Sequence, residues 1–305
     1  MEAAIPAQKH VSSSENKPSW QAHLSLRCVG GDYGARLVST EHHGPLYVQK
    51  PFYPEGKDCV HIYPLHPPGG VVSGDALHIQ LRAESKANVV ITTPGATRFY
   101  KSRYKNLKQD ANQTVINKIT IRDGSCVEWL PMETIVFNGA QAKNNTQVYL
   151  DNSAQFIGWE VCCLGLPASE APFEKGALSQ RFELYRQNKP LLIDRLHFSA
   201  DSPVLNTRAG LGGHTVYGTF VCAPPVEHLL NDANESQALL TRIREEMATQ
   251  AFAEKFSITW INKVYLARYL GNNAEEARAG FASIWQIIRP ALTGREACPP
   301  RIWRT

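Results

Sequence analysis

Short apolar segments with alternating polar positions dominate the chain between about residue 20 and residue 225. Leu77, Ile79 and Leu81 alternate with polar neighbours, which is the period of a strand with one buried face. Other apolar segments stop at turn dipeptides such as Asp123-Gly124 and Asp151-Asn152. Because no helix-length periodic segment separates these strands, the pattern predicts a mainly β fold and not alternating α/β units.

Two segments modify this picture without changing the fold class. Phe156–Leu164 is an almost unbroken apolar run, which predicts a strand buried on both faces. The glycine-rich segment 210–213 lacks the spacing of a dinucleotide-binding loop, and we interpret it as a turn.

The last third of the chain predicts two amphipathic helices. The first would be capped at Asn234 or Ser236 and would bury one apolar face made of Leu239, Leu240, Ile243, Met247 and Ala251. The second would begin near Asn273 and would end or kink at Arg289-Pro290. Between the helices, residues 257–270 mix aromatic and β-branched side chains and predict one more strand.

Composition suits a folded protein and excludes several classes. The chain has 305 residues, 43% of them hydrophobic, and a formal net charge of +4. Its 32 basic and 28 acidic residues are interspersed, which argues against nucleic-acid binding. Residues 1–18 are polar and predict a disordered tail, followed by a single domain over residues 19–305. No stretch is apolar enough for a signal peptide or a membrane helix, so we expect a cytoplasmic protein.

The cysteines do not follow a known framework. There are seven, scattered and without a Cys-x-x-Cys pair, so most are expected to be small buried hydrophobic residues. Cys59, His61 and His66 form a candidate metal-ligand set, because alternate residues of an extended segment share a face and imidazole and thiolate suit nickel or zinc. Ordinary packing or surface roles are the alternative for these three residues.

Four acidic residues interrupt apolar, strand-like sequence: Asp75, Glu128, Glu133 and Glu160. Burial of an unpaired carboxylate is costly, so each must have a partner, face solvent or face an internal water-filled space. An outward-facing polar row on a strand is one interpretation, and a glycosidase-like pair of carboxylates is another.

Six segments in order resemble the UreD (UreH) family of urease accessory proteins. They cover residues 44–56, 65–75, 92–102, 128–133, 156–160 and 300–303 and include Leu65-His66-Pro67-Pro68-Gly69-Gly70, Thr92-Thr93-Pro94-Gly95-Ala96 and Glu128-Trp129-Leu130-Pro131. The resemblance extends from about residue 20 to the end of the sequence.

The resemblance implies an irregular, β-helix-like stack of strands with two α-helices, and a urease maturation factor that is not an enzyme. Such a protein would bind a UreF-type accessory protein and, through it, a UreG-type GTPase, and would dock on apo-urease. Nickel would pass through an internal polar channel and no cofactor would be bound tightly. The channel candidates are Asp75, Glu128, Glu133, Glu160, Thr92 and Thr93.

Two other interpretations remain open from the sequence. One is a β-rich metalloenzyme that uses His66 and nearby carboxylates. The other is a protein-binding module with no route for a metal.

Overall fold

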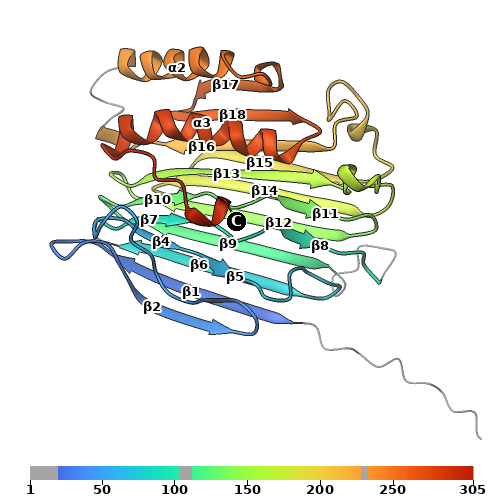
Figure 1. Ribbon diagram of the computed structural model, residues 1–305, viewed down its shortest axis with the longest axis horizontal. Coiled ribbons are helices and arrows are strands. Elements are labelled where there is room, and N and C mark those ends of the chain that lie inside the picture. The colour runs from blue at the N-terminus through green and yellow to red at the C-terminus, as the bar shows by residue number, and fades with distance from the viewer. Residues whose placement is uncertain (1–19, 85, 104–111, 228–232, 305) are drawn as a thin grey trace, which may run out of the picture.

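Two stacked β-sheets and a layer of helices make up the part of the chain that the computed structural model describes, residues 20–84, 86–103, 112–227 and 233–304. The seven-stranded sheet has the order β15-β14-β12-β9-β6-β1-β2. The helix-covered sheet has the order β17-β18-β16-β13-β10-β7-β4, with β11 and β8 attached beside β13. Figure 1 shows α2 and α3 at one end of the molecule and β2 at the other. The mainly β prediction is confirmed. The tail predicted for residues 1–18 lies outside the described residues, and the single domain stays a prediction.

The strands of the seven-stranded sheet are β1 (Gln21–Val29), β2 (Arg36–His43), β6 (Ala76–Glu84), β9 (Gln113–Ile121), β12 (Gln141–Leu150), β14 (Ala177–Arg186) and β15 (Lys189–Ser199). Those of the helix-covered sheet are β4 (Val60–Ile62), β7 (Asn88–Ile91), β8 (Thr97–Phe99), β10 (Cys126–Trp129), β11 (Thr134–Val136), β13 (Gln155–Leu164), β16 (Val216–Ala223), β17 (Phe256–Ile261) and β18 (Val264–Gly271). A small separate pair is β3 (Tyr47–Val48) with β5 (Pro64–Leu65).

The chain winds between the two main sheets as an irregular coil. It passes from β6 to β7, then from β9 to β10 and from β12 to β13, so that each turn adds one strand to each sheet. The stacked strands are parallel, as in a β-helix. The turns differ in length, since Val89 lies opposite both Val60 and Val127. This irregularity explains why the sequence shows no fixed repeat.

Alternation along each strand separates two apolar layers. On β13, Phe156 and Cys162 pack between the two sheets, whereas Ile157 and Trp159 pack under the helices. All of β13 is therefore buried, which confirms the prediction from its unbroken apolar run.

The helices are α2 (Ala233–Ala248) and α3 (Ala274–Thr293). Asn234 and Ser236 lie inside α2, so the predicted cap position was wrong, and Ala251 lies beyond the end of the helix. The second helix begins near Asn273 as predicted, and the Asn273 side chain caps it by accepting hydrogen bonds from the backbone of Glu275 and Glu276. None of the described helices is both long enough and apolar enough to cross a membrane.

Two predicted boundaries in this region were wrong. The second helix was predicted to end or kink at Arg289-Pro290; it does not end there but continues to Thr293 and closes on Gly294 in the left-handed conformation, and the kink stays a prediction. The single strand predicted for residues 257–270 is a hairpin of β17 and β18, turned by Asn262 and Lys263, which both have positive φ. The short polar turn was hidden within a continuous series of aromatic and β-branched residues.

Two neighbouring glycines in the turn before β6 are required for different reasons. Gly69 has a φ of 73°, a conformation that strains any residue with a Cβ atom. Gly70 has ordinary backbone angles, but a Cβ atom there would lie 2.2 Å from the ring of Tyr100.

We expect Gly69→Ala to lower the free energy of unfolding by about 1–2 kcal/mol through backbone strain. Gly70→Ala should lower it by about 1–3 kcal/mol because Tyr100 has to move. Gly95→Ala is the matched control, since its Cβ atom would meet nothing within 4 Å. Urea unfolding curves give all three values, and unchanged midpoints for the first two variants would contradict the described turn.

Candidate functional site

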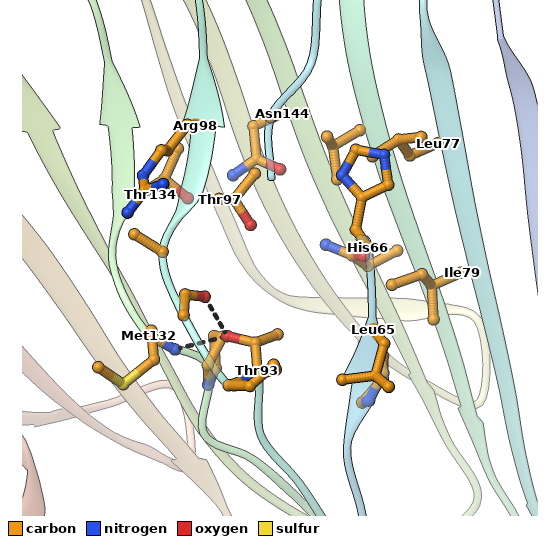
Figure 2. A pocket seen from close by; sticks show the side chains of 18 of the residues that line it. Leu65, His66, Leu77, Ile79, Thr93, Thr97, Arg98, Met132, Thr134 and Asn144 are labelled. Atoms are coloured by element: carbon orange, nitrogen blue, oxygen red, sulfur yellow. Dashed lines mark hydrogen bonds between the residues drawn. The ribbon is translucent and has the colours of Figure 1, made fainter. Parts of the chain in front are cut away.

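A cavity of about 340 Å³ opens between the two sheets, next to the turn at Gly69 and Gly70. Its walls are mostly apolar, and Leu77 and Ile79 of β6 form part of them (Figure 2). The polar side chains among its lining residues are those of His66, Thr93, Thr97, Arg98, Asn117, Thr134, Asn144 and Glu160. A small number of polar groups in an apolar cavity is the usual composition of a binding site or a passage.

Several buried polar atoms of the lining residues have no hydrogen-bond partner among the described residues. They are Nε2 of His66, Oδ1 of Asn117 and Nε1 of Trp129. Burial lowers the pKa of His66, against the opposite effect of Asp75, so the imidazole is neutral near pH 7. Because the cavity has room for water, a hydrated cation or water can satisfy these atoms.

Glu160 is the charged group at the centre of this region. It is 8% exposed, and its side chain points from β13 toward the seven-stranded sheet. Thr146 Oγ1 donates to one carboxylate oxygen at 2.5 Å, and Gln180 Nε2 donates to the other at 2.9 Å. Burial raises the pKa of Glu160 to about 6, although these two hydrogen bonds lower it. A carboxylate held in this way can accept either a proton or a cation near neutral pH.

A second cavity, of about 200 Å³, lies on the other side of Glu160. Its lining includes Gln180, Asp194, Tyr217 and Arg268, and Glu160 lines both cavities. The Tyr217 hydroxyl donates to Gln180 at 2.5 Å. Arg268 donates to Asp194 at 2.5 Å, and both side chains are partly exposed. Polar groups therefore continue from the interior past Glu160 to the surface.

The side chains of the other channel candidates form hydrogen bonds or ion pairs within the fold. Both carboxylate oxygens of Asp75 accept backbone N–H groups, from Trp20 and Val72. Thr92 donates to the carbonyl of Leu130 and accepts from Trp303. Thr93 lines the first cavity, where it donates to Gly95 O and accepts from the backbone of Met132 (Figure 2).

Glu133 lies 2.9 Å from Arg278 of α3, on the side of the sheet that faces the helices. Of the six candidates, the structure therefore brings Glu160 and Thr93 to the first cavity and leaves the other four outside its lining.

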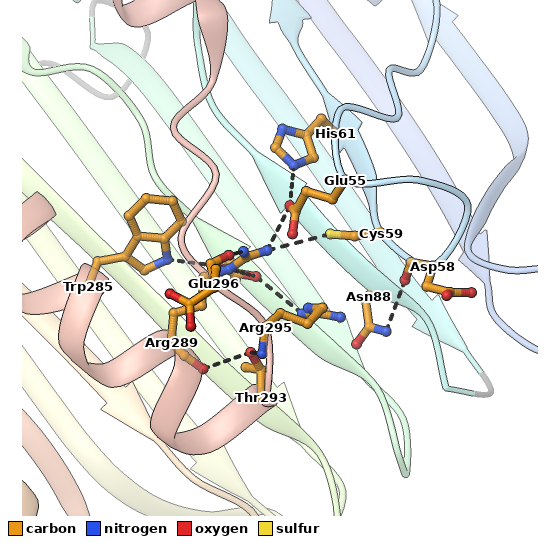
Figure 3. Close-up of polar contacts among 11 residues, drawn as sticks. Glu55, Asp58, Cys59, His61, Asn88, Trp285, Arg289, Thr293, Arg295 and Glu296 are labelled. Atoms are coloured by element: carbon orange, nitrogen blue, oxygen red, sulfur yellow. Dashed lines mark hydrogen bonds and ion pairs between the residues drawn. The ribbon is translucent and has the colours of Figure 1, made fainter.

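Glu128 belongs to a charged cluster under α3 and not to the cavity. It is fully buried and accepts hydrogen bonds from Trp285 at 2.6 Å and from Arg289 at 2.9 Å. Arg289 also donates to Glu55 at 2.7 Å (Figure 3). Arg295 lies 3.4 Å from Glu128. This cluster joins the helix layer to the sheet through paired charges.

The predicted metal ligands are divided between two places. Cys59 and His61 come together under α3, where their ligand atoms and that of Glu55 all lie within 4.8 Å of one another. His66 is not among them, since it lines the inter-sheet cavity. The guanidinium of Arg289 lies 2.7 Å from Glu55 and 3.9 Å from the sulfur of Cys59 (Figure 3).

The guanidinium of Arg289 already provides the positive charge that balances the Glu55 carboxylate. Burial alone would raise the pKa of Glu55, but hydrogen bonds from His61 and Arg289 lower it to about 2. Burial, together with Glu128, raises the pKa of Cys59, which keeps this residue a thiol. A second cation would have to displace Arg289, so the arrangement favours an ion-pair network over a metal centre.

Several important residues were missed in the sequence. Arg289 was interpreted only as a helix boundary, although it follows Trp285 by one helical turn and so lies within the apolar stripe of α3. A charge in such a stripe indicates a buried partner. Asn117 and Thr146 occupy inward positions of β9 and β12 next to buried Ile119 and Val148, which marks polar positions inside the sheet.

Comparisons with known proteins identify the family of this chain. A family profile described as UreD urease accessory protein matches residues 21–304. A protein named urease accessory protein UreD from Psychromonas ingrahamii is 40% identical over 297 residues, covering 96% of both chains. The UreD of Dechloromonas aromatica is 39% identical, over 97% of this chain and 98% of its own. The UreD of Alcanivorax borkumensis is 40% identical, over 100% and 99%. The chain belongs to the UreD family.

Membership of the UreD family implies a role in urease maturation. The two polar regions of the chain differ in their contacts. The charged cluster around Glu128 accounts for how the helices are held, whereas the groups around Glu160 line internal space.

We expect Glu128→Leu to lower the free energy of unfolding by about 3–5 kcal/mol, because it leaves Arg289 buried without its main partner. The double variant Glu128→Leu/Arg289→Met should recover part of this loss. Asp151→Asn, which removes an exposed ion pair with Arg122, is the control and should cost less than about 1 kcal/mol. Strictly additive effects in urea unfolding would show that Glu128 and Arg289 do not interact.

A second prediction concerns the pH dependence of stability. The folded-state pKa of Glu160, about 6, exceeds its ordinary value of 4.5, so the folded protein binds this proton more tightly than the unfolded chain does. The ionised form therefore destabilises the fold above pH 6, by about 2 kcal/mol at most, and this cost disappears as the pH falls toward 4.5. Glu160→Gln should remove this contribution, measured as the difference between the unfolding free energies of the two proteins at pH 7 and pH 5.

Proposed function

We propose that this chain is a non-catalytic scaffold of urease maturation that passes nickel through the space between its two sheets. In this proposal it binds a UreF-type accessory protein and, through it, a UreG-type GTPase, and the assembly docks on apo-urease. The family assignment supports the maturation role. The internal route is supported by the two cavities that meet at Glu160.

The observation that carries the proposal is the position of Glu160. Its carboxylate borders both cavities, and the polar side chains beyond it reach partly exposed Asp194 and Arg268. A divalent cation is strongly penalised in an apolar interior, and one negative group with hydroxyl and amide neighbours reduces this penalty. Glu160 is therefore the position along the route at which a cation would be stabilised most.

The chemistry of the lining suits passage better than storage. The side-chain ligands near Glu160 are mainly hydroxyl, amide and carboxylate oxygens, to which a hydrated ion binds without being held tightly. Conduction requires binding that is weak enough for release. Cys162 follows Glu160 by two residues on the same strand, but burial raises its pKa to about 12, so it stays a thiol and a poor metal ligand.

One observation favours an alternative, the metalloenzyme that uses His66. The unpartnered Nε2 atom of His66 lines the same cavity as Glu160. However, both oxygens of Asp75, the carboxylate that affects the pKa of His66, are held by backbone N–H groups. The scaffold proposal therefore accounts for more of the site, and it predicts no turnover by the isolated chain.

Urease activation with the Glu160→Gln variant tests the route. The change removes the charge but keeps the size and the acceptor for Thr146, so the complex with UreF-type and UreG-type partners should still form. Nickel delivery to apo-urease should slow by at least about tenfold, which corresponds to the loss of only ~1.4 kcal/mol of cation stabilisation. The measurements are nickel content by metal analysis, urease activity and co-purification of the complex.

Glu133→Gln is the matched control, because it removes one carboxylate that pairs with Arg278 outside the first cavity. Full activation by Glu160→Gln would refute the route through this residue. Loss of the complex in that variant would instead assign Glu160 to folding or docking.

A further inference from the structure

Three histidines lie side by side on adjacent strands at one edge of the seven-stranded sheet. His23 of β1 is directly opposite His43 of β2 and directly opposite His78 of β6. Figure 1 shows these three strands together, at the end of the molecule away from the helices. The residues are far apart in sequence, so this grouping arises only from the strand register.

All three side chains belong to the outer face of the sheet. The neighbours of His23, Ala22 and Leu24, are buried, which turns His23 outward. Leu77 and Ile79 line the inner cavity, so His78 between them points away from it. His23 and His43 are exposed and His78 is half-buried. The row is therefore separated from the proposed nickel route by the thickness of the sheet.

We propose that His23, His43 and His78 together bind one divalent transition-metal ion of the imidazole-binding class, such as Ni²⁺, Zn²⁺ or Cu²⁺. Neighbouring strands of a sheet lie about 4.7–4.9 Å apart, which lets directly opposite imidazoles reach a common ion. A rigid sheet fixes the Cβ positions before the ion arrives. Imidazole is a good ligand for all three metals.

An acidic side chain is placed to complete the coordination. Glu41 precedes His43 by two residues on β2 and lies opposite Ser25, so it shares the outer face with the three histidines. It is exposed and diagonal to His23, within reach of a long side chain. Three imidazoles and one carboxylate suit a four-coordinate ion.

The rings are available for this role. In the described ranges no hydrogen bond or ion pair occupies His23, His43 or His78, and the group whose ligand atoms already meet within 4.8 Å is a different one. The ion would therefore draw the rings together by rotation of side chains that are free to change rotamer.

Equilibrium dialysis of the untagged full chain against Ni²⁺, and separately against Zn²⁺, at pH 7.5 tests the site. His23 is the central ligand, so His23→Ala should weaken one bound ion by at least about tenfold, since even the loss of an outer-sphere partner costs that much. His23→Ala/His78→Ala should abolish that ion. With Cu²⁺, the electron paramagnetic resonance spectrum should show coupling to more than one nitrogen, and this coupling should disappear in the double variant.

His197→Ala is the matched control, because His197 is an exposed histidine on β15 of the same sheet, opposite Ser179 and not another histidine. It should leave stoichiometry and affinity unchanged. Circular dichroism and thermal unfolding of the exposed-site variants verify that the fold is kept. The proposal is overturned if the His23→Ala variant binds as many ions, and as tightly, as the wild-type chain. Full urease activation by the double variant would leave the nickel route intact, since the two sites lie on opposite faces of the sheet.

Discussion

The register of the stacked parallel strands determines which chemistry each face of this protein has. Side chains alternate between faces along a strand, so a slip of one residue would exchange every inward and outward position. On β10, Glu128 faces the helices while Val127 and Trp129 face the space between the sheets. On β13, Glu160 faces that space while Trp159 and Val161 face the helices. Two glutamates in similar apolar sequence thus have opposite surroundings because of position alone.

The buried charges of Glu128 and Glu160 are stabilised in different ways. Glu128 is compensated by cations, with Arg289 and Arg295 on the helix side. Glu160 has no cation at hydrogen-bond distance among the described residues and is held by neutral donors, so its pKa is raised to about 6. The ion pairs of Glu128 fix two layers to each other. The neutral donors around Glu160 leave its negative charge unbalanced, and a cation that binds for a short time can balance it.

The sequence predicted the β-rich class, the two helices and the buried strand 156–164, because these depend on periodicity within one segment. It did not predict the distribution of the candidate residues. Cys59 and His61 share a face, as alternation requires, but only the tertiary structure shows that Glu55 and Arg289 join them. Pairing of β1 with β2 and β6 is likewise a long-range feature, and it creates the histidine row that no local pattern indicates.

Other predicted boundaries were wrong because tertiary packing outweighed the local sequence signal. A proline normally discourages a helix, but the packed helix α3 continues past Pro290 to Thr293. Asn262 and Lys263 form a tight turn without glycine, so the hairpin was not separable from a single strand by composition.

The charged cluster under α3 also has a consequence for the order in which the molecule is assembled during synthesis. The contact between Glu55 and Arg289 joins residues 234 positions apart, and that between Glu128 and Arg289 joins residues 161 apart. A ribosome therefore produces the whole coil of strands before α3 emerges to cover it. During that interval the apolar outer face of the helix-covered sheet, including Trp159 and Phe220, faces solvent with an uncompensated carboxylate in its middle. Contacts of such long range are slow to form, so the nascent chain is prone to aggregate during this period.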